Sequence, residues 1–126
     1  MLDRLDLQIE VPALLSNELL GSQPAEPTAA VRARVFAARE RQRARGWLNA
    51  ALPNAALQRH GALDGDGRRL VAEAMDRGGM SARGVHRALR VARTIADLAG
   101  EERVTAMRLA EGLQYRAYEV RRFVAR

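Results

Sequence analysis

The sequence has no cysteine, no lysine and few aromatic residues, and each absence excludes a kind of chemistry. Without cysteine the chain forms no disulfide, no thiol redox centre and no cysteine-ligated zinc site. Without lysine it has no P-loop lysine, no Schiff-base lysine and no other catalytic lysine. Aromatic residues make up only 4% of the chain, which argues against nucleic-acid binding by base stacking.

Long hydrophobic runs are missing as well. No apolar stretch approaches the roughly 20 residues that cross a bilayer. The N-terminus, MLDRLDLQIEV, is acidic and alternating, unlike a basic signal peptide. We therefore expect a soluble, cytoplasmic protein with no membrane partner, and its 126 residues, 48% of them hydrophobic, suffice for one domain with a modest core.

The charge is strongly positive, with a net value of +6, and all 21 basic residues are arginine. Two explanations remain open. A GC-rich genome replaces lysine by arginine throughout, without functional meaning. Alternatively, the forked guanidinium group binds phosphate through two parallel hydrogen bonds, so that an arginine-rich chain favours nucleic acid or a nucleotide as its partner.

The first 27 residues predict no helical domain of their own. Residues 5–11, LDLQIEV, alternate apolar and polar in the manner of a half-buried strand that ends at Pro12. No second strand-like run follows, so we expect residues 1–12 to be a strand remnant that is disordered here, with its partner strands outside this chain. Residues 13–27 have the composition of a linker, and the helical domain should span 28–126.

From residue 28 onward, apolar residues recur with helical spacing and predict an all-α bundle of four to five helices behind a loose, extended N-terminal arm. The first helix should begin at a Thr28 cap and end before Gly46. One of its faces should be buried, and this face carries Val31, Val35, Ala38 and Gln42.

The other helices are predicted from their caps and glycine stops. Ser81 can cap a helix over 82–99 that Gly100 ends, and Thr105 can cap a last helix that reaches the C-terminus. Asn54 can cap a short helical turn, and a further helix is expected over 66–77. Four residues of the connection over 47–63 should be buried in the core: Trp47, Leu48, Leu52 and Leu57. The apolar stripe of the last helix should include Ala117, Val120 and Val124.

Common catalytic groups find no support in this sequence. His60 and His86 lie in separate segments without a second ligand at metal-binding spacing, so we predict no metal site. Ser81 is better explained as a helix cap than as a nucleophile, and acidic pairs such as Asp64 and Asp66 border helices in loops. Arginine is the residue type that remains.

Two arginines of the helix over 82–99 differ in their setting. Arg93 lies four residues before Asp97, and we interpret it as the cation of a surface ion pair worth a few tenths of a kcal/mol. Arg83 lies in the first turn, where the helix dipole disfavours a cation. That position favours a role for Arg83 in binding an external anion.

Several segments resemble one family of proteins. These are LDRLDL at residues 2–7, RVFAARERQRAR at 34–45, SARGVHRALRVARTIADL at 81–98 and AEGLQYR at 110–116. Together they resemble the C-terminal, or lid, region of magnesium-chelatase-like AAA+ ATPases of the ComM/YifB group. The resemblance covers almost the whole chain, and it makes residues 1–12 the remnant of the last strand of the ATPase core.

The resemblance implies roles for two residues. Arg4 matches the arginine finger that reaches the γ-phosphate bound by a neighbouring subunit, and Arg83 matches the sensor-2 arginine that contacts the nucleotide from the lid. Both would place positive charge where phosphoryl transfer develops negative charge. The chain contains no G-x-x-x-x-G-K-[ST] motif, so we expect it not to be an enzyme by itself.

The resemblance also implies partners and cofactors. The full-length protein would use ATP and Mg²⁺, with none bound to this chain alone, and its partners would be the ATPase core of the same chain and neighbouring subunits of a hexameric ring. It would act on DNA, in branch migration during uptake and recombination. The first helix can meet phosphates or an acidic neighbouring subunit through Arg32, Arg39 and Arg43.

A second function remains possible. The chain can be an autonomous basic helical module that binds nucleic acid or a protein partner without nucleotide chemistry. The two hypotheses differ in what Arg83 does, because only the first needs this residue for ATP turnover.

Overall fold

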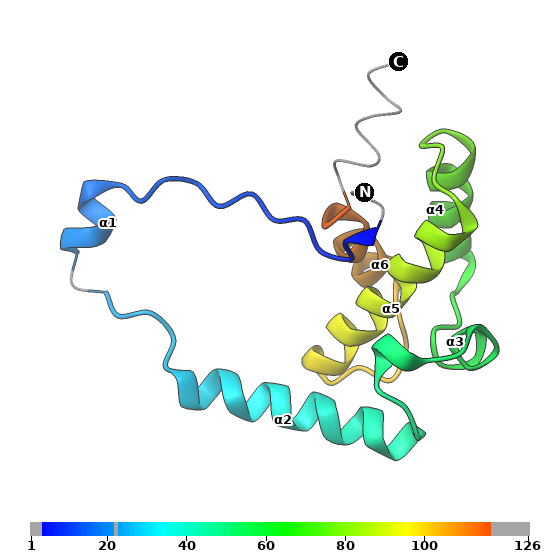
Figure 1. The fold of residues 1–126 in the computed structure, drawn as a ribbon, viewed down its shortest axis with the longest axis horizontal. Coiled ribbons are helices and arrows are strands. Elements are labelled where there is room, and N and C mark those ends of the chain that lie inside the picture. The colour runs from blue at the N-terminus through cyan, green and yellow to red at the C-terminus, as the bar shows by residue number, and fades with distance from the viewer. Residues whose placement is uncertain (1–3, 22, 117–126) are drawn as a thin grey trace.

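The computed structural model describes residues 4–21 and 23–116, and within them all regular secondary structure is helical. The helices are α1 (Ser16–Leu20), α2 (Thr28–Arg45), the 3₁₀ turn η2 (Asn49–Ala51), α3 (Asn54–His60), α4 (Gly65–Asp76), α5 (Ala82–Ala99) and α6 (Ala106–Gln114). Figure 1 shows α3, α4 and α6 gathered around α5, with α2 along one side. The predicted all-α fold is confirmed.

Helix α5 is the centre of the domain, and its ends are fixed as the sequence predicts. The Ser81 hydroxyl accepts a hydrogen bond from the Gly84 amide at 3.1 Å, and Gly100 adopts the left-handed conformation, with φ of 75°, that ends a helix. One face of α5 consists of three fully buried alanines: Ala88, Ala92 and Ala96. These small side chains allow neighbouring helices to approach closely.

Helix α6 makes the closest approach to α5. A Cβ atom at Gly112 would lie 3.1 Å from the Ala88 carbonyl oxygen, so a side chain at this position would crowd the backbone of α5. Leu109 and Val104 complete a core cluster with the alanines of α5. The Thr105 hydroxyl caps α6 by accepting a hydrogen bond from the Arg108 amide at 3.4 Å, as predicted.

Helix α2 packs on the domain through only its second half. Ala38 and Gln42 are buried, whereas Val31 is 39% exposed and Val35 is 45% exposed. The periodic face was predicted correctly, but burial of its first half was wrong, because no described residue covers that half. Thr28 is not the cap: Pro27 occupies the cap position, and its carbonyl accepts the first helical hydrogen bonds.

The connection between α2 and α4 also differs in part from the prediction. Leu52 and Leu57 are buried as expected, but Trp47 and Leu48 are each 40% exposed and add little to the core. Pro53, not Asn54, is the cap of α3, because the helix already includes Asn54. The Asn54 side chain instead accepts a hydrogen bond from Arg90 Nη2 at 2.9 Å.

Residues 4–15 of the N-terminal arm are mainly extended, and no strand occurs among them. The arm contacts the end of α6, where the Gln8 amide donates to the Tyr115 carbonyl oxygen at 2.8 Å. Beyond Ile9, residues 10–21 and 23–27 run away from α3–α6 toward the start of α2 (Figure 1). The predicted linker contains the short helix α1, none of whose residues is buried.

The C-terminal residues predicted to extend the stripe of α6, Ala117, Val120 and Val124, lie outside the described residues. Among the residues that are described, none of the helices is both long enough and apolar enough to span a membrane.

Candidate nucleotide-contacting arginines and their supports

Arg83 lies in the first turn of α5, two residues after the Ser81 cap, with its side chain exposed. It donates no hydrogen bond and forms no ion pair with any other described residue. The first turn of α5 carries no acidic residue that would offset its charge. The structure therefore presents an uncompensated guanidinium group beside the positive end of a helix, where an external anion is favoured.

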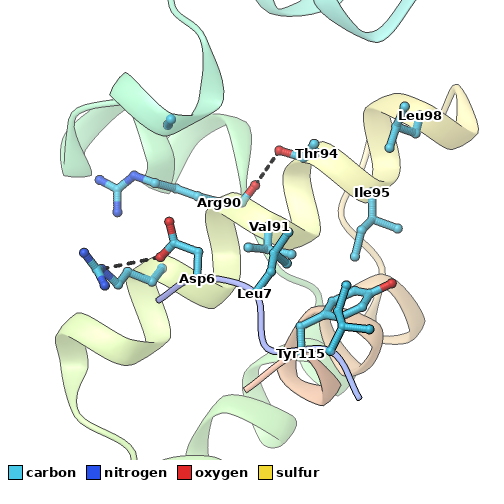
Figure 2. Close-up of a pocket in the computed structure, with 11 residues that line it drawn as sticks. Asp6, Leu7, Arg90, Val91, Thr94, Ile95, Leu98 and Tyr115 are labelled. Carbon is cyan, nitrogen blue, oxygen red and sulfur yellow. Dashed lines mark hydrogen bonds and ion pairs between the residues drawn. The ribbon is translucent and has the colours of Figure 1, made fainter. Parts of the chain in front are cut away.

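Arg4, the other candidate, is exposed on the N-terminal arm. Two residues later, the Asp6 carboxylate lies 3.5 Å from Arg87 Nε, an ion pair that Figure 2 draws as a dashed line. Arg87 follows Arg83 by one helical turn. The arm is thus attached to α5 one turn beyond Arg83, and Arg4 precedes this attachment directly.

Arg116 also contacts the N-terminal arm. Its side chain is almost completely buried, donates from Nη1 to the Leu5 carbonyl oxygen at 3.2 Å, and lies 3.9 Å from Asp6 Oδ1. The segments LDRLDL and AEGLQYR, more than a hundred residues apart, therefore contact each other. Sequence reasoning assigned Arg116 no role, because nothing in a single sequence indicates which distant carbonyl a buried arginine will meet.

A mainly apolar cavity of about 540 Å³ lies between the arm, α5 and α6 (Figure 2). Its apolar wall comprises Leu7, Ile9, Val91, Ile95 and Leu98. At one end, Arg90 Nη2 donates to the Leu52 carbonyl oxygen at 2.7 Å, which ties α5 to the connection before α3. Neither Arg4 nor Arg83 lines this cavity.

Arg93 is buried, and its prediction as a surface residue was wrong. The side chain is 2% exposed and donates to three carbonyl oxygens, those of His60 at 3.0 Å, Glu102 at 2.8 Å and Glu101 at 2.7 Å. It also forms the predicted ion pair with Asp97, at 3.0 Å. Burial lowers the pKa of Arg93, and the neighbouring Asp97 carboxylate opposes that shift.

Asp97 is the centre of a buried polar network that joins three elements. Its carboxylate accepts hydrogen bonds from both terminal nitrogens of Arg45 on α2, and from Asn49 Nδ2 at 2.8 Å. The Gln42 side chain accepts from the Asn49 amide at 2.8 Å. Arg45 and Asn49 are about fifty residues from Asp97, so the spacing of Arg93 and Asp97 alone did not indicate this network.

The three arginines predicted for DNA or subunit contact lie on the outer side of α2 and are exposed. Arg43 forms an ion pair with Glu40 at 2.6 Å, whereas no other described residue accepts a hydrogen bond from Arg32 or Arg39. Two basic side chains on α2 therefore stay available to a partner.

Metal-binding groups do not gather in the described part of the chain, where no three His, Asp or Glu residues lie close enough together to hold an ion. His60 is half-buried at the end of α3, and burial, with the nearby charges of Arg45, Arg59 and Arg93, lowers its pKa. The neutral imidazole is therefore favoured in the folded protein.

Comparison with known proteins identifies a family. Residues 25–116 match the family described as magnesium chelatase, subunit ChlI C-terminal. The competence protein ComM of Haemophilus influenzae is 42% identical over 118 residues, which are 92% of this chain and 23% of that protein. The YifB protein of Salmonella typhimurium is 37% identical over 123 residues, 94% of this chain and 24% of that protein.

A more distant relative aligns over similar shares of the two chains. The protein Mb2921c of Mycobacterium bovis is 35% identical over 127 aligned residues, 97% of this chain and 25% of its own length. The chain thus spans about a quarter of the length of the curated relatives it matches.

Proposed function

Because the chain belongs to the family of magnesium chelatase ChlI C-terminal domains, we propose that it works as the helical lid of a larger, ring-forming AAA+ ATPase of the ComM/YifB type. In this role the lid carries Arg83 to the γ-phosphate, while Arg4 serves the site of a neighbouring subunit. The observation that carries the proposal is the exposed, unpaired Arg83 at the positive end of a capped helix, in a chain of this family.

The described residues suit a contact with a nucleotide but not a complete binding site. Arg83 offers one or two charge-assisted hydrogen bonds to a phosphate. The chain has no lysine and no P-loop, and its described part gathers no carboxylates for magnesium, so ATP and Mg²⁺ would be held by the ATPase core. When bound there, they supply the phosphoryl group and the charge that offsets its oxygens.

The link between the segments that carry Arg4 and Arg83 supports coupling between neighbouring ATP sites. Asp6 pairs with Arg87 one turn from Arg83, so the arm that carries Arg4 is attached to the helix that carries Arg83. Because the resemblance assigns Arg4 to the last strand of the ATPase core and Arg83 to the lid, this ion pair would connect the core and the lid of one subunit. This arrangement can link the state of one ATP site to that of the next around a hexameric ring.

Exposed apolar side chains support the presence of an ATPase core beside this domain in the full-length protein. Between the arm and α2, the exposed large hydrophobic residues are Ile9, Val11, Leu14, Leu15, Leu19, Leu20, Val31, Val35 and Phe36. So many exposed large apolar side chains along one segment favour a contact with another part of a protein. Because the relatives are about four times longer than this chain, we propose that an ATPase core in the full-length protein covers these side chains.

DNA is the proposed substrate of the full-length protein, which we place in the cytoplasm as a motor for branch migration. The net charge of +6 and the exposed Arg32 and Arg39 favour a phosphate-bearing partner. Arg32 lies on the half of α2 that projects from the domain, and Arg39 lies exposed at the start of the half that packs on it, so a duplex or an acidic neighbouring subunit can approach both.

ATP turnover by the full-length protein tests the proposal. We expect Arg83→Ala to lower turnover at least tenfold, because a transition-state charge contact is lost, and Arg4→Ala to lower it about 10³-fold, as for other arginine fingers. The control is Arg77→Ala, an exposed arginine at the end of α4, which should leave turnover unchanged.

Mixing the two variants tests whether Arg4 acts between subunits. A ring that contains both Arg4→Ala and Arg83→Ala subunits has some interfaces with both arginines intact, so turnover should partly recover on mixing. Normal turnover by Arg83→Ala, together with salt-sensitive duplex binding by the 126-residue chain, would instead favour the autonomous module.

A further inference from the structure

A second, basic cavity lies at the far end of α5, between α2, α3 and the loop that precedes α6. Its volume is about 510 Å³, and four arginines from three helices line it: Arg41, Arg45, Arg59 and Arg93. The acidic residues that line it are Asp97, Glu101 and Glu102. This cavity plays no part in the nucleotide contacts proposed above.

The carboxylates of this cavity are mostly engaged. The Asp97 carboxylate accepts hydrogen bonds from Arg45 and Asn49 and pairs with Arg93, and the Glu101 carboxylate accepts from Arg108 Nη2 at 2.8 Å. The Arg108 hydrogen bond lowers the pKa of Glu101, which keeps that carboxylate charged and bound to Arg108. Of the three acidic residues that line the cavity, only Glu102 has an exposed carboxylate without a hydrogen-bond partner among the described residues.

The guanidinium groups of the cavity are less fully engaged. Arg41 makes one long hydrogen bond, from Nη1 to the Asp97 carbonyl oxygen at 3.5 Å, and rests against Gly100. Arg59 is exposed at the end of α3 and donates no hydrogen bond to another described residue. The Nε atoms of Arg45 and Arg93 are buried without a partner in the described structure.

These observations leave positive charge in excess, and we propose that the cavity binds a phosphate-type anion between Arg41 and Arg59. Arginine forks match the oxygens of a phosphate, and two such groups on separate helices can hold it from two sides. Arg45 and Arg93, fixed by Asp97, supply the positive potential behind them. Burial is the main cause of the lowered pKa of His60, and the charges of Arg45, Arg59 and Arg93 add to it.

The site is separate from Arg83. Asp97 follows Arg83 by fourteen positions on α5, which corresponds to about 20 Å along the helix axis. The ligand can be a backbone phosphate of DNA or a free phosphate group, and both share the chemistry that the arginines recognise. Failure of Arg83 as a nucleotide contact would leave this inference intact.

The test is an NMR titration of the ¹⁵N-labelled 126-residue chain with inorganic phosphate and, separately, with a short DNA duplex. We expect amide shifts at the ends of α2, α3 and α5 and at residues 100–102. The double variant Arg41→Gln/Arg59→Gln should weaken binding roughly tenfold or more. Glu102→Gln should strengthen it, because a repulsive charge is removed.

The matched control is Arg69→Gln/Arg77→Gln on α4, which removes the same charge elsewhere and should change affinity less than about threefold. Thermal unfolding of each variant verifies that the fold persists. Competition between duplex and phosphate identifies a DNA phosphate as the ligand, and binding of phosphate alone identifies a free one, so both outcomes support the site. Absence of shifts with either ligand, or an equal loss in the control, overturns it.

Discussion

Residues 38–116 and residues 4–37 contain the same kinds of side chain but differ completely in burial. The first region packs its apolar residues around α5, whereas none of the described residues of the second is buried. Helix α2 passes from one region into the other without a break in its hydrogen bonding or its periodic face. The comparison shows that a local pattern sets a helix, while burial depends on a partner, which the second region lacks here.

The largest loss of stability is expected when the centre of the buried polar network is removed. Asp97→Ala should destabilise the chain by about 3–5 kcal/mol, because Arg45 and Arg93 would remain buried without their carboxylate. Urea unfolding followed by circular dichroism measures the loss. The control Asp76→Ala removes an exposed carboxylate from α4 and should change stability by less than about 0.5 kcal/mol. Equal effects of the two would show that the network does not hold α2 on α5.

A leucine from each region sharpens the contrast. Leu109→Ala should cost about 3 kcal/mol, because this fully buried side chain fills the core between α5 and α6. Leu20→Ala should change stability by less than about 0.5 kcal/mol, since Leu20 is 83% exposed on α1. Chemical denaturation of the 126-residue chain gives both values. In the full-length protein the effect of Leu20→Ala should increase, if the ATPase core covers the arm.

The smallest effect distinguishes the two helix starts. Ser81→Ala should cost about 1 kcal/mol, because it removes the hydrogen bond to the Gly84 amide. Thr28→Ala should stay within about 0.5 kcal/mol, since Thr28 lies inside α2 and is not its cap. Thermal unfolding of the two variants side by side is the measurement. A cost at Thr28 as large as that at Ser81 would contradict the observed start of α2.

A sequence pattern predicted some features of the candidate site and missed others. The exposure of Arg83 in the first turn of a capped helix could be predicted, because a cap and a periodic stripe are local signals. The burial of Arg93 could not, because its acceptors are the carbonyl oxygens of His60, Glu101 and Glu102, brought together by the fold. An i, i+4 ion pair has the same sequence pattern on the surface and in the interior.

Local sequence patterns were enough to predict the helical class, both ends of α5, the cap of α6, the periodic face of α2 and the likeness to a family of ATPases. These depend on neighbouring residues, whose spacing is fixed by the chain. The packing of the helices was needed to show which part of that face is buried, which arginines are internal, and that the arm contacts Arg87 and Arg116. Such contacts join residues far apart in the chain, and their energies depend on distances that a sequence does not contain.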